Sequence, residues 1–191
     1  MEELFAGFVQ EETPAKIVGL AIGSSPQWPS KRWAVESFQE LSKRLIGKQY
    51  RVVLIGSKED AALAEKWTGE ITGKWLNLVG KTSLQELVSI IKRLDVLVAG
   101  DTAPLHVAAA VKTKIVTLFG PTDPARHTPP QSDVIILTRH LPCQPCYKGD
   151  CRIEEKNACL NRISVDEVFQ AVLKQLTSAE KETTPAVSSK L

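Results

Sequence analysis

Short apolar segments rich in valine and isoleucine alternate along the chain with longer segments in which apolar residues recur every three or four positions. The short segments predict six strands, at residues 16–22, 51–55, 76–79, 95–99, 115–119 and 134–137. Several of them, such as Val-Val-Leu-Ile at 52–55, are continuously apolar. That pattern is typical of strands covered on both faces, as in a parallel sheet.

The longer segments predict amphipathic helices. One apolar stripe runs from Val35 to Leu45, and Gly47 is placed to end that helix. Two further stripes, at 84–91 and 165–176, each follow a serine that has a glutamate three residues later, which is the capping-box pattern. Strands that alternate with helices predict an α/β fold, an open parallel sheet with helices on both faces and right-handed crossovers.

The alternation also suggests how the chain is divided. It places a single folded unit at residues 15–177, a size usual for one domain. Residues 1–14 precede it as a linker or an ordered arm, and Pro14 marks their end. Residues 178–191 are polar and lack periodicity, so we expect a flexible tail there.

Composition and charge argue against several classes of protein. The 24 basic and 22 acidic residues are scattered, and no basic block or stripe suggests nucleic-acid binding. No apolar run approaches the ~18 residues that a membrane span requires. The acidic first dozen residues differ from the basic start of a signal peptide. We therefore expect a soluble, cytoplasmic protein.

All four cysteines fall in one stretch, at Cys143, Cys146, Cys151 and Cys159. The first pair has the spacing of a metal knuckle, but seven residues separate the second pair. Structural zinc sites usually close each pair within two to four residues, and disulfides are disfavoured in a reducing cytosol. The spacing favours a cysteine-bearing surface loop over a metal site, and we assign no metal ligand and no cofactor.

Ligands of open α/β sheets bind beyond the carboxyl ends of the strands, where loops lead into helices. After the first predicted strand, residues 23–33 carry Lys31, which can reach a phosphate or simply be solvated. This loop lacks both the dinucleotide glycine fingerprint and the Walker lysine motif. After the second strand, Glu59 and Asp60 suit hydrogen bonds to a ribose, or equally the positive end of the next helix.

A third loop, at residues 100–106, precedes a short helix predicted at 107–111. Pro104 suits a first helical turn, where free backbone N–H groups favour an anion such as a diphosphate. Asp101 and His106 serve either a ligand or the structure, as a cap and a core side chain. Their joint position at a strand end favours the ligand.

Two motifs in this part of the chain carry a family resemblance. Residues 101–110 (Asp-Thr-Ala-Pro-Leu-His-Val-Ala-Ala-Ala), followed by 119–124 (Phe-Gly-Pro-Thr-Asp-Pro), resemble the signature of the heptosyltransferases. These enzymes form the ADP-heptose:lipopolysaccharide glycosyltransferase family. Residues 31–33 and the cysteine stretch are similar to that family too, and the resemblance covers about residues 15–177. It implies a Rossmann-like domain that forms the C-terminal, donor-binding half of a two-domain GT-B glycosyltransferase.

The resemblance also implies a set of substrate-binding side chains: Lys31, Glu59, Thr82, Asp101, Thr102, Ala103 and His106. Within this set, Lys31 would contact donor phosphate and Glu59 the ribose. Thr82 matches a position near the adenine, or else is a plain helix-entry residue. Ala103 stands where the family more usually has glycine, and its methyl group leaves less room beside the ligand.

The implied reaction moves heptose from ADP-heptose to a lipopolysaccharide core acceptor, with the chain peripheral at the inner membrane. In this family the acceptor half supplies the presumed base, so we assign no catalytic residue and expect the acceptor to bind through a missing N-terminal domain. One alternative is a non-catalytic nucleotide-sugar-binding module. Another is a nicotinamide-dependent dehydrogenase, which the absent glycine fingerprint disfavours.

Overall fold

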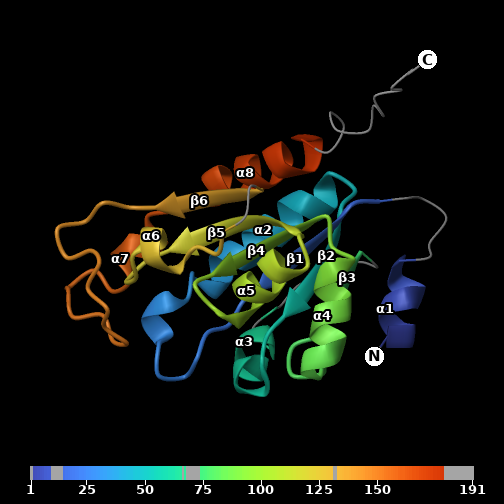
Figure 1. The fold of residues 1–191 in the computed structure, drawn as a ribbon, viewed down its shortest axis with the longest axis horizontal. Coiled ribbons are helices and arrows are strands. Elements are labelled where there is room, and N and C mark those ends of the chain that lie inside the picture. Colours follow the sequence, from blue (N-terminus) through green and yellow to red (C-terminus); the bar gives the residue numbers. More distant parts are fainter. Residues whose placement is uncertain (1, 10–14, 66, 68–73, 131–132, 179–191) are drawn as a thin grey trace, which may run out of the picture.

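The computed structural model describes residues 2–9, 15–65, 67, 74–130 and 133–178 (Figure 1). This part of the chain forms a six-stranded sheet of order β3-β2-β1-β4-β5-β6, in which every neighbouring pair is parallel. The strands are β1 (Ile17–Ala21), β2 (Arg51–Ile55), β3 (Trp75–Asn77), β4 (Val96–Gly100), β5 (Lys114–Phe119) and β6 (Val134–Thr138). The predicted open parallel sheet is confirmed.

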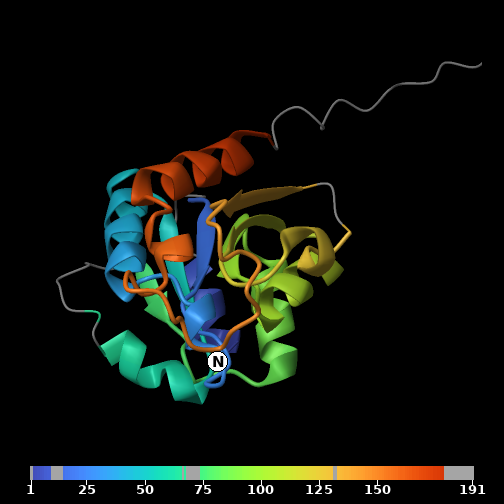
Figure 2. The same ribbon diagram turned by 90° about the vertical axis from the view of Figure 1, so that its left-hand side faces the viewer.

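Helices cover both faces of this sheet (Figures 1 and 2). On one face α2 (Val35–Gly47) and α8 (Val165–Thr177) pack side by side. On the other lie α4 (Leu84–Lys92), α5 (Ala103–Ala110) and α1 (Glu2–Val9). The strands β1, β2 and β4 bury every residue, because alternate side chains enter the two separate apolar cores.

Local sequence signals account for the helix boundaries. Ser83 and Glu86 form the predicted capping box of α4, with the Ser83 backbone N–H donating to Glu86 Oε2 at 2.8 Å. The same box, from Ser164 and Glu167, begins α8. The prediction for α5 was too short: it begins at Ala103 rather than at residue 107, since Pro104 belongs inside its first turn.

Shorter helical segments complete the connections. They are η1 (Pro29–Lys31), η2 (Lys58–Asp60), α3 (Ala61–Glu65), α6 (Pro124–His127) and α7 (Ala158–Asn161). Two of them, η1 and η2, follow β1 and β2 directly at the carboxyl edge of the sheet. They place Lys31, Glu59 and Asp60 at that edge.

The N-terminal segment contributes packing of its own. Phe5 of α1 is buried, and the Arg93 guanidinium lies 4.9 Å from the centre of its ring. The Arg51 side chain donates to the Phe8 carbonyl at 2.7 Å. The segment expected as a linker or arm at 1–14 thus includes a helix packed on the domain. Apart from Ser178, the tail expected at 178–191 lies outside the described residues.

No helix in the described ranges is long and apolar enough to cross a membrane.

Candidate functional site

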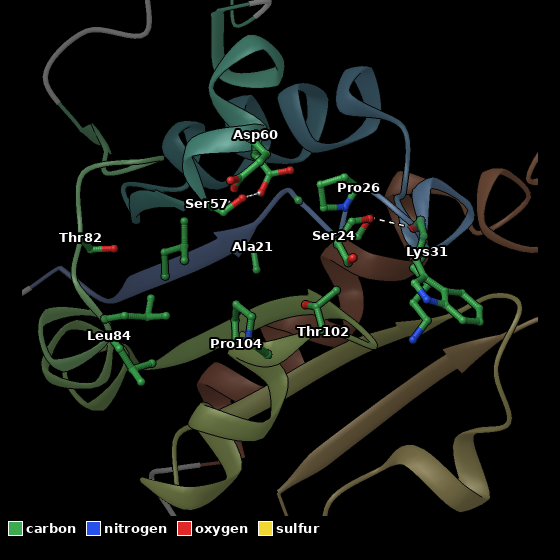
Figure 3. Close-up of a pocket in the computed structure, with 18 of the residues that line it drawn as sticks. Ala21, Ser24, Pro26, Lys31, Ser57, Asp60, Thr82, Leu84, Thr102 and Pro104 are labelled. Atoms are coloured by element: carbon green, nitrogen blue, oxygen red, sulfur yellow. Dashed lines mark hydrogen bonds between the residues drawn. The ribbon is translucent and has the colours of Figure 1, made fainter. Parts of the chain in front are cut away.

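A cavity of about 590 Å³ lies where the strand order reverses, between β1 and β4 (Figure 3). Its walls come from residues that follow three strands and from the start of one helix. They are 21, 23–26, 28 and 31 at or after the end of β1, 55–57, 59 and 60 at or after the end of β2, 82–84 and 87 at the start of α4, and 101–104 after β4. Connections on either side of β1 and β4 leave in opposite directions, so a crevice opens at this point. Its size suits a small-molecule ligand.

Lys31 supplies positive charge at one end of the cavity. Its ammonium nitrogen lies 2.7 Å from Asp101 Oδ2 and 4.7 Å from the centre of the Trp28 ring. Both charged side chains are largely shielded, with 17% of Lys31 and 5% of Asp101 exposed. An ammonium group has three donors, so the ion pair leaves Lys31 able to donate to an anion as well.

The start of α5 lies beside this ion pair. Thr102 and Ala103 line the cavity, and the Thr102 side chain leaves the helix uncapped, since it makes no hydrogen bond to the first turn. Free N–H groups and the helix dipole therefore favour negative charge at this point. The Ala103 residue is exposed beside the cavity, where its methyl group narrows the approach to the backbone.

His106 lies outside the cavity wall. Its Nε2 atom is 4.0 Å from Asp101 Oδ1, and 55% of the side chain is exposed. The structure thus brings six of the seven predicted residues into one cavity lining, and places His106 next to it behind Asp101.

Asp60 lines the cavity and joins the loops after β1 and β2. Its Oδ2 atom accepts hydrogen bonds from the Ser57 backbone N–H at 2.9 Å and from the Ser57 hydroxyl at 2.8 Å. The Arg32 guanidinium reaches Asp60 Oδ1 at 3.5 Å and donates to the Ser24 carbonyl at 3.0 Å. A Cβ atom at Gly23 would lie 1.9 Å from Asp60 Oδ2, so glycine is required there.

Glu59 differs from its neighbour. It is exposed and lines the cavity, whereas Asp60 is 2% exposed. The Ser57 hydroxyl, which Glu59 shares with Asp60, lowers the pKa of Glu59 below its ordinary value, with help from the Glu59 backbone. The two alternatives expected for this loop, hydrogen bonding to a ligand and a structural role at the start of the next helix, thus apply to different residues. Asp60 caps the turn, and Glu59 is the carboxylate free to accept from a ligand hydroxyl.

The opposite end of the cavity is apolar. Thr82, Leu84 and Leu87 line it, and Figure 3 shows Thr82 and Leu84 on the side away from Lys31. Leu84 is 69% exposed and lines the cavity, so it presents apolar surface to a ligand. Sequence reasoning missed Leu84 and Trp28 as site residues. Leu84 fits the apolar stripe of its helix, so its position in the sequence predicts burial instead.

The four cysteines line a second cavity, of about 220 Å³, beyond the end of β5. Burial, reinforced by the three other cysteines, raises the pKa of Cys159 to about 11. All four are free thiols. Within the described part of the chain, no three or more His, Cys, Asp or Glu side chains are arranged to hold a metal ion.

A parallel sheet of order 3-2-1-4-5-6, with its cavity at the reversal point, defines a nucleotide-binding α/β domain of the Rossmann type. The model of glycosyltransferase family 9 (heptosyltransferase) matches residues 6–157, and the chain belongs to this family.

One relative agrees with this assignment, and two solved structures share the fold. Lipooligosaccharide heptosyltransferase 2 of Haemophilus influenzae is 36% identical over 115 residues, which are 58% of this chain and 33% of that protein. The structure of E. coli ADP-heptose lps heptosyltransferase II superposes with a TM-score of 0.77 at 24% identity. That match covers 94% of this chain and 52% of the other.

The structure of E. coli heptosyltransferase WaaC with ADP has a TM-score of 0.65 at 18% identity. This match covers 86% of the present chain and 46% of the other. The chain therefore spans between a third and a half of the length of these relatives.

Proposed function

We propose that this chain is the donor-binding half of a heptosyltransferase, and that the whole enzyme moves heptose from ADP-heptose to a lipopolysaccharide core acceptor. The observation that carries the proposal is the cavity with two chemically different ends. Lys31 and the uncapped start of α5 suit a diphosphate, and the apolar surface at Leu84 suits a nucleobase. The name of E. coli ADP-heptose lps heptosyltransferase II points to the same donor.

Each lining group has a part in this proposal. Glu59 accepts hydrogen bonds from the ribose hydroxyls between the two ends, and Thr82 lies beside the adenine. Asp101 holds Lys31 in place, and together with Thr102, Ala103 and His106 it borders the diphosphate and the heptose. The ends of β1, β2 and β4 and the start of α4 carry these groups, so rigid elements fix their spacing.

The same groups assist bond cleavage. When the bond between the heptose and the diphosphate breaks, negative charge grows on the departing ADP. The Lys31 ammonium and the positive end of the α5 dipole lie at the end of the cavity that we propose for the diphosphate, which supports their role in stabilising the developing charge. The chain thereby promotes departure of the leaving group.

Activation of the acceptor needs further groups. A base has to lie within ~3 Å of the acceptor hydroxyl, or one water away. We assign this base to an acceptor half, because the chain matches only 33% and 52% of the length of two heptosyltransferase relatives. Because the acceptor is a lipid-linked sugar, we also propose a cytoplasmic location with peripheral association at the inner membrane.

Calorimetric titration with ADP-heptose, ADP, UDP-glucose and NAD⁺ tests the proposal. We expect ADP-heptose and ADP to bind, and UDP-glucose to bind at least tenfold more weakly. The reason is that the pocket at Leu84 and Thr82 has to select adenine over uracil. Preferential binding of NAD⁺ would instead support a dehydrogenase. Failure of every nucleotide to bind would refute the donor assignment.

A further inference from the structure

Residues 139–157, all of which the structure describes, connect β6 to α7 without helix or strand. Figure 1 shows this connection in orange beyond the carboxyl ends of β5 and β6. Irregular connections of this length are uncommon in compact domains, and those that are ordered often serve a function. We call it the 139–157 loop.

The loop is joined to the turn that carries Lys31. The Ser30 hydroxyl donates to the Lys148 carbonyl at 2.6 Å, and the Ser30 backbone N–H donates to the Gly149 carbonyl at 3.0 Å. Ser30 is 4% exposed, so neither bond competes with bulk water. Ser30 immediately precedes Lys31 in η1, so the loop holds the backbone from which the Lys31 side chain projects.

The fit at this junction is close. A Cβ atom at Gly149 would lie 2.3 Å from the Gln27 carbonyl oxygen, a backbone atom that no side-chain rotation can move away. On the opposite side, a Cβ atom at Gly100 would lie 2.9 Å from the Lys31 carbonyl oxygen. The turn is therefore enclosed between the loop and the end of β4.

The other side of the loop is fastened to the sheet. The Gln144 side chain donates to the Gly120 carbonyl at 2.7 Å, and the Tyr147 backbone N–H donates to the Pro121 carbonyl at 2.9 Å. Gly120 and Pro121 directly follow β5. The loop thus bridges the end of β5 to η1, across the edge of the sheet that holds the cavity.

We propose that the 139–157 loop is a positioning element of the donor site, in which Gly149 and Ser30 set the place of the Lys31 ammonium. The identity of the ligand at Lys31 rests on the proposed function. The placement of Lys31 against Asp101 does not, because the loop would set it in the free protein too. Gly149 and Ser30 are positioning residues, and neither lines the donor cavity.

The first experiment needs no ligand. Acylation of the folded protein with limiting acetic anhydride, followed by mass spectrometry, measures the reactivity of each lysine. Gly149→Ala displaces the turn and separates Lys31 from Asp101, so we expect Lys31 to be acylated several-fold faster. Ser30→Ala is expected to act in the same direction. Gly47→Ala is the matched control, because a Cβ atom there meets nothing within 4 Å.

The second experiment uses calorimetry with ADP and adenosine on the same variants. Gly149→Ala should weaken ADP about tenfold, as expected from loss of one charge-assisted contact, and should leave adenosine within about twofold. In a Lys31→Ala background the same change should have no further effect on ADP. Circular dichroism and thermal melts establish that each variant is folded.

The outcomes distinguish the positioning role of the 139–157 loop from the proposed function. Unchanged Lys31 acylation in folded Gly149→Ala and Ser30→Ala proteins refutes the positioning role, whatever the ligand does. An equal loss of ADP and adenosine, or a loss that persists without Lys31, also refutes it. If the unaltered chain binds no nucleotide, the proposed function fails, and the acylation rates alone decide the role of the loop.

Discussion

The ammonium nitrogen of Lys31 lies 2.7 Å from a carboxylate oxygen of Asp101, although 70 positions separate the two residues in the chain. The pair joins the loop after β1 to the loop after β4, across the point where the strand order reverses. In the proposed function, an incoming diphosphate has to share Lys31 with Asp101. The two residues are consequently expected to respond differently to substitution.

Lys31→Ala should weaken ADP and ADP-heptose alike, by tenfold or more, since it removes the charge at the diphosphate end. Asp101→Ala should weaken ADP-heptose more than ADP. Loss of the carboxylate removes an acceptor for sugar hydroxyls, which weakens only ADP-heptose. It also frees Lys31 and removes a negative charge beside the diphosphate, and these two changes favour both ligands. Calorimetry with both ligands measures the difference. Equal losses for both ligands in Asp101→Ala would contradict this division.

Substitution of His106 tests the part of the site that we propose borders the heptose. The side chain lies behind Asp101 and outside the cavity lining, with 55% of it exposed. We expect His106→Ala to weaken ADP-heptose, to leave ADP unchanged and to shift the melting temperature little. The same titrations measure these effects. A loss of ADP affinity, or a failure to fold, would show that His106 does something else.

Gly23→Ala tests the fastening by Asp60. The new Cβ atom would overlap the Asp60 carboxylate, which accepts two hydrogen bonds from Ser57 and cannot move freely. We expect a loss of unfolding free energy of about 1–3 kcal/mol, typical of overpacking, measured by urea denaturation. Gly47→Ala, which meets no neighbour, should change the unfolding free energy by less than about 1 kcal/mol.

The thiol of Cys159 is expected to make the free energy of unfolding depend on pH in the alkaline range. Its pKa is about 11 in the folded protein, against an ordinary value of 9.0. Below pH 9 the thiol keeps its proton in both states and adds no pH dependence. As pH rises from 9 to 11 the unfolded chain loses this proton first, so the free energy of unfolding falls.

Urea denaturation at pH 8, 9.5 and 10.5 measures this slope. Cys159→Ala should fall less steeply with pH than the unaltered protein over this range. Cys143→Ala is the control, because Cys143 is exposed. Identical slopes for the Cys159→Ala and unaltered proteins would show that Cys159 does not titrate in this way.

The chain alone is expected to bind ADP-heptose without transferring heptose. The proposed function gives the cavity the diphosphate and the nucleoside, whereas transfer needs a positioned acceptor, a base and closure against water. Mass spectrometry of a lipopolysaccharide-core acceptor incubated with chain and donor checks this. Supplying an acceptor half should restore transfer if the halves dock. Turnover by the 191-residue chain on its own would overturn the prediction.

Continuous apolar runs made the sheet predictable, because strands buried on both faces leave little choice of residue. The bounds of β2 were predicted without error, and the serine–glutamate boxes located α4 and α8. The start of α5 was predicted too late, because the residues of its first turn lack the apolar periodicity of a helix. Pro104 was the local signal for that earlier start.

The contacts around the site were less accessible to sequence reasoning. Nothing local distinguishes Glu59 from Asp60. Asp60 has a structural role because Gly23 and Arg32, from the neighbouring loop, lie against its carboxylate. Ser30 and Lys148 are 118 positions apart, so the bond between them depends on the whole sheet having formed. Hydrophobic pattern and residue propensity report on residues that are close in sequence, whereas the site is formed by residues that are distant in sequence and close in space.

The central place of β1 has a consequence for how the protein assembles. Its partner β2 follows soon after it along the chain, but its other partner β4 comes much later, and Asp95 bonds the Ile17 backbone N–H from 78 positions away. Pairings of such long range form slowly, because loop-closure entropy opposes them. A partly folded chain with only β1 and β2 paired has half of the crevice and no partner for Lys31. A nucleotide that binds the crevice therefore stabilises only molecules in which β4 has joined the sheet, by about 2.7 kcal/mol at a hundredfold excess over Kd.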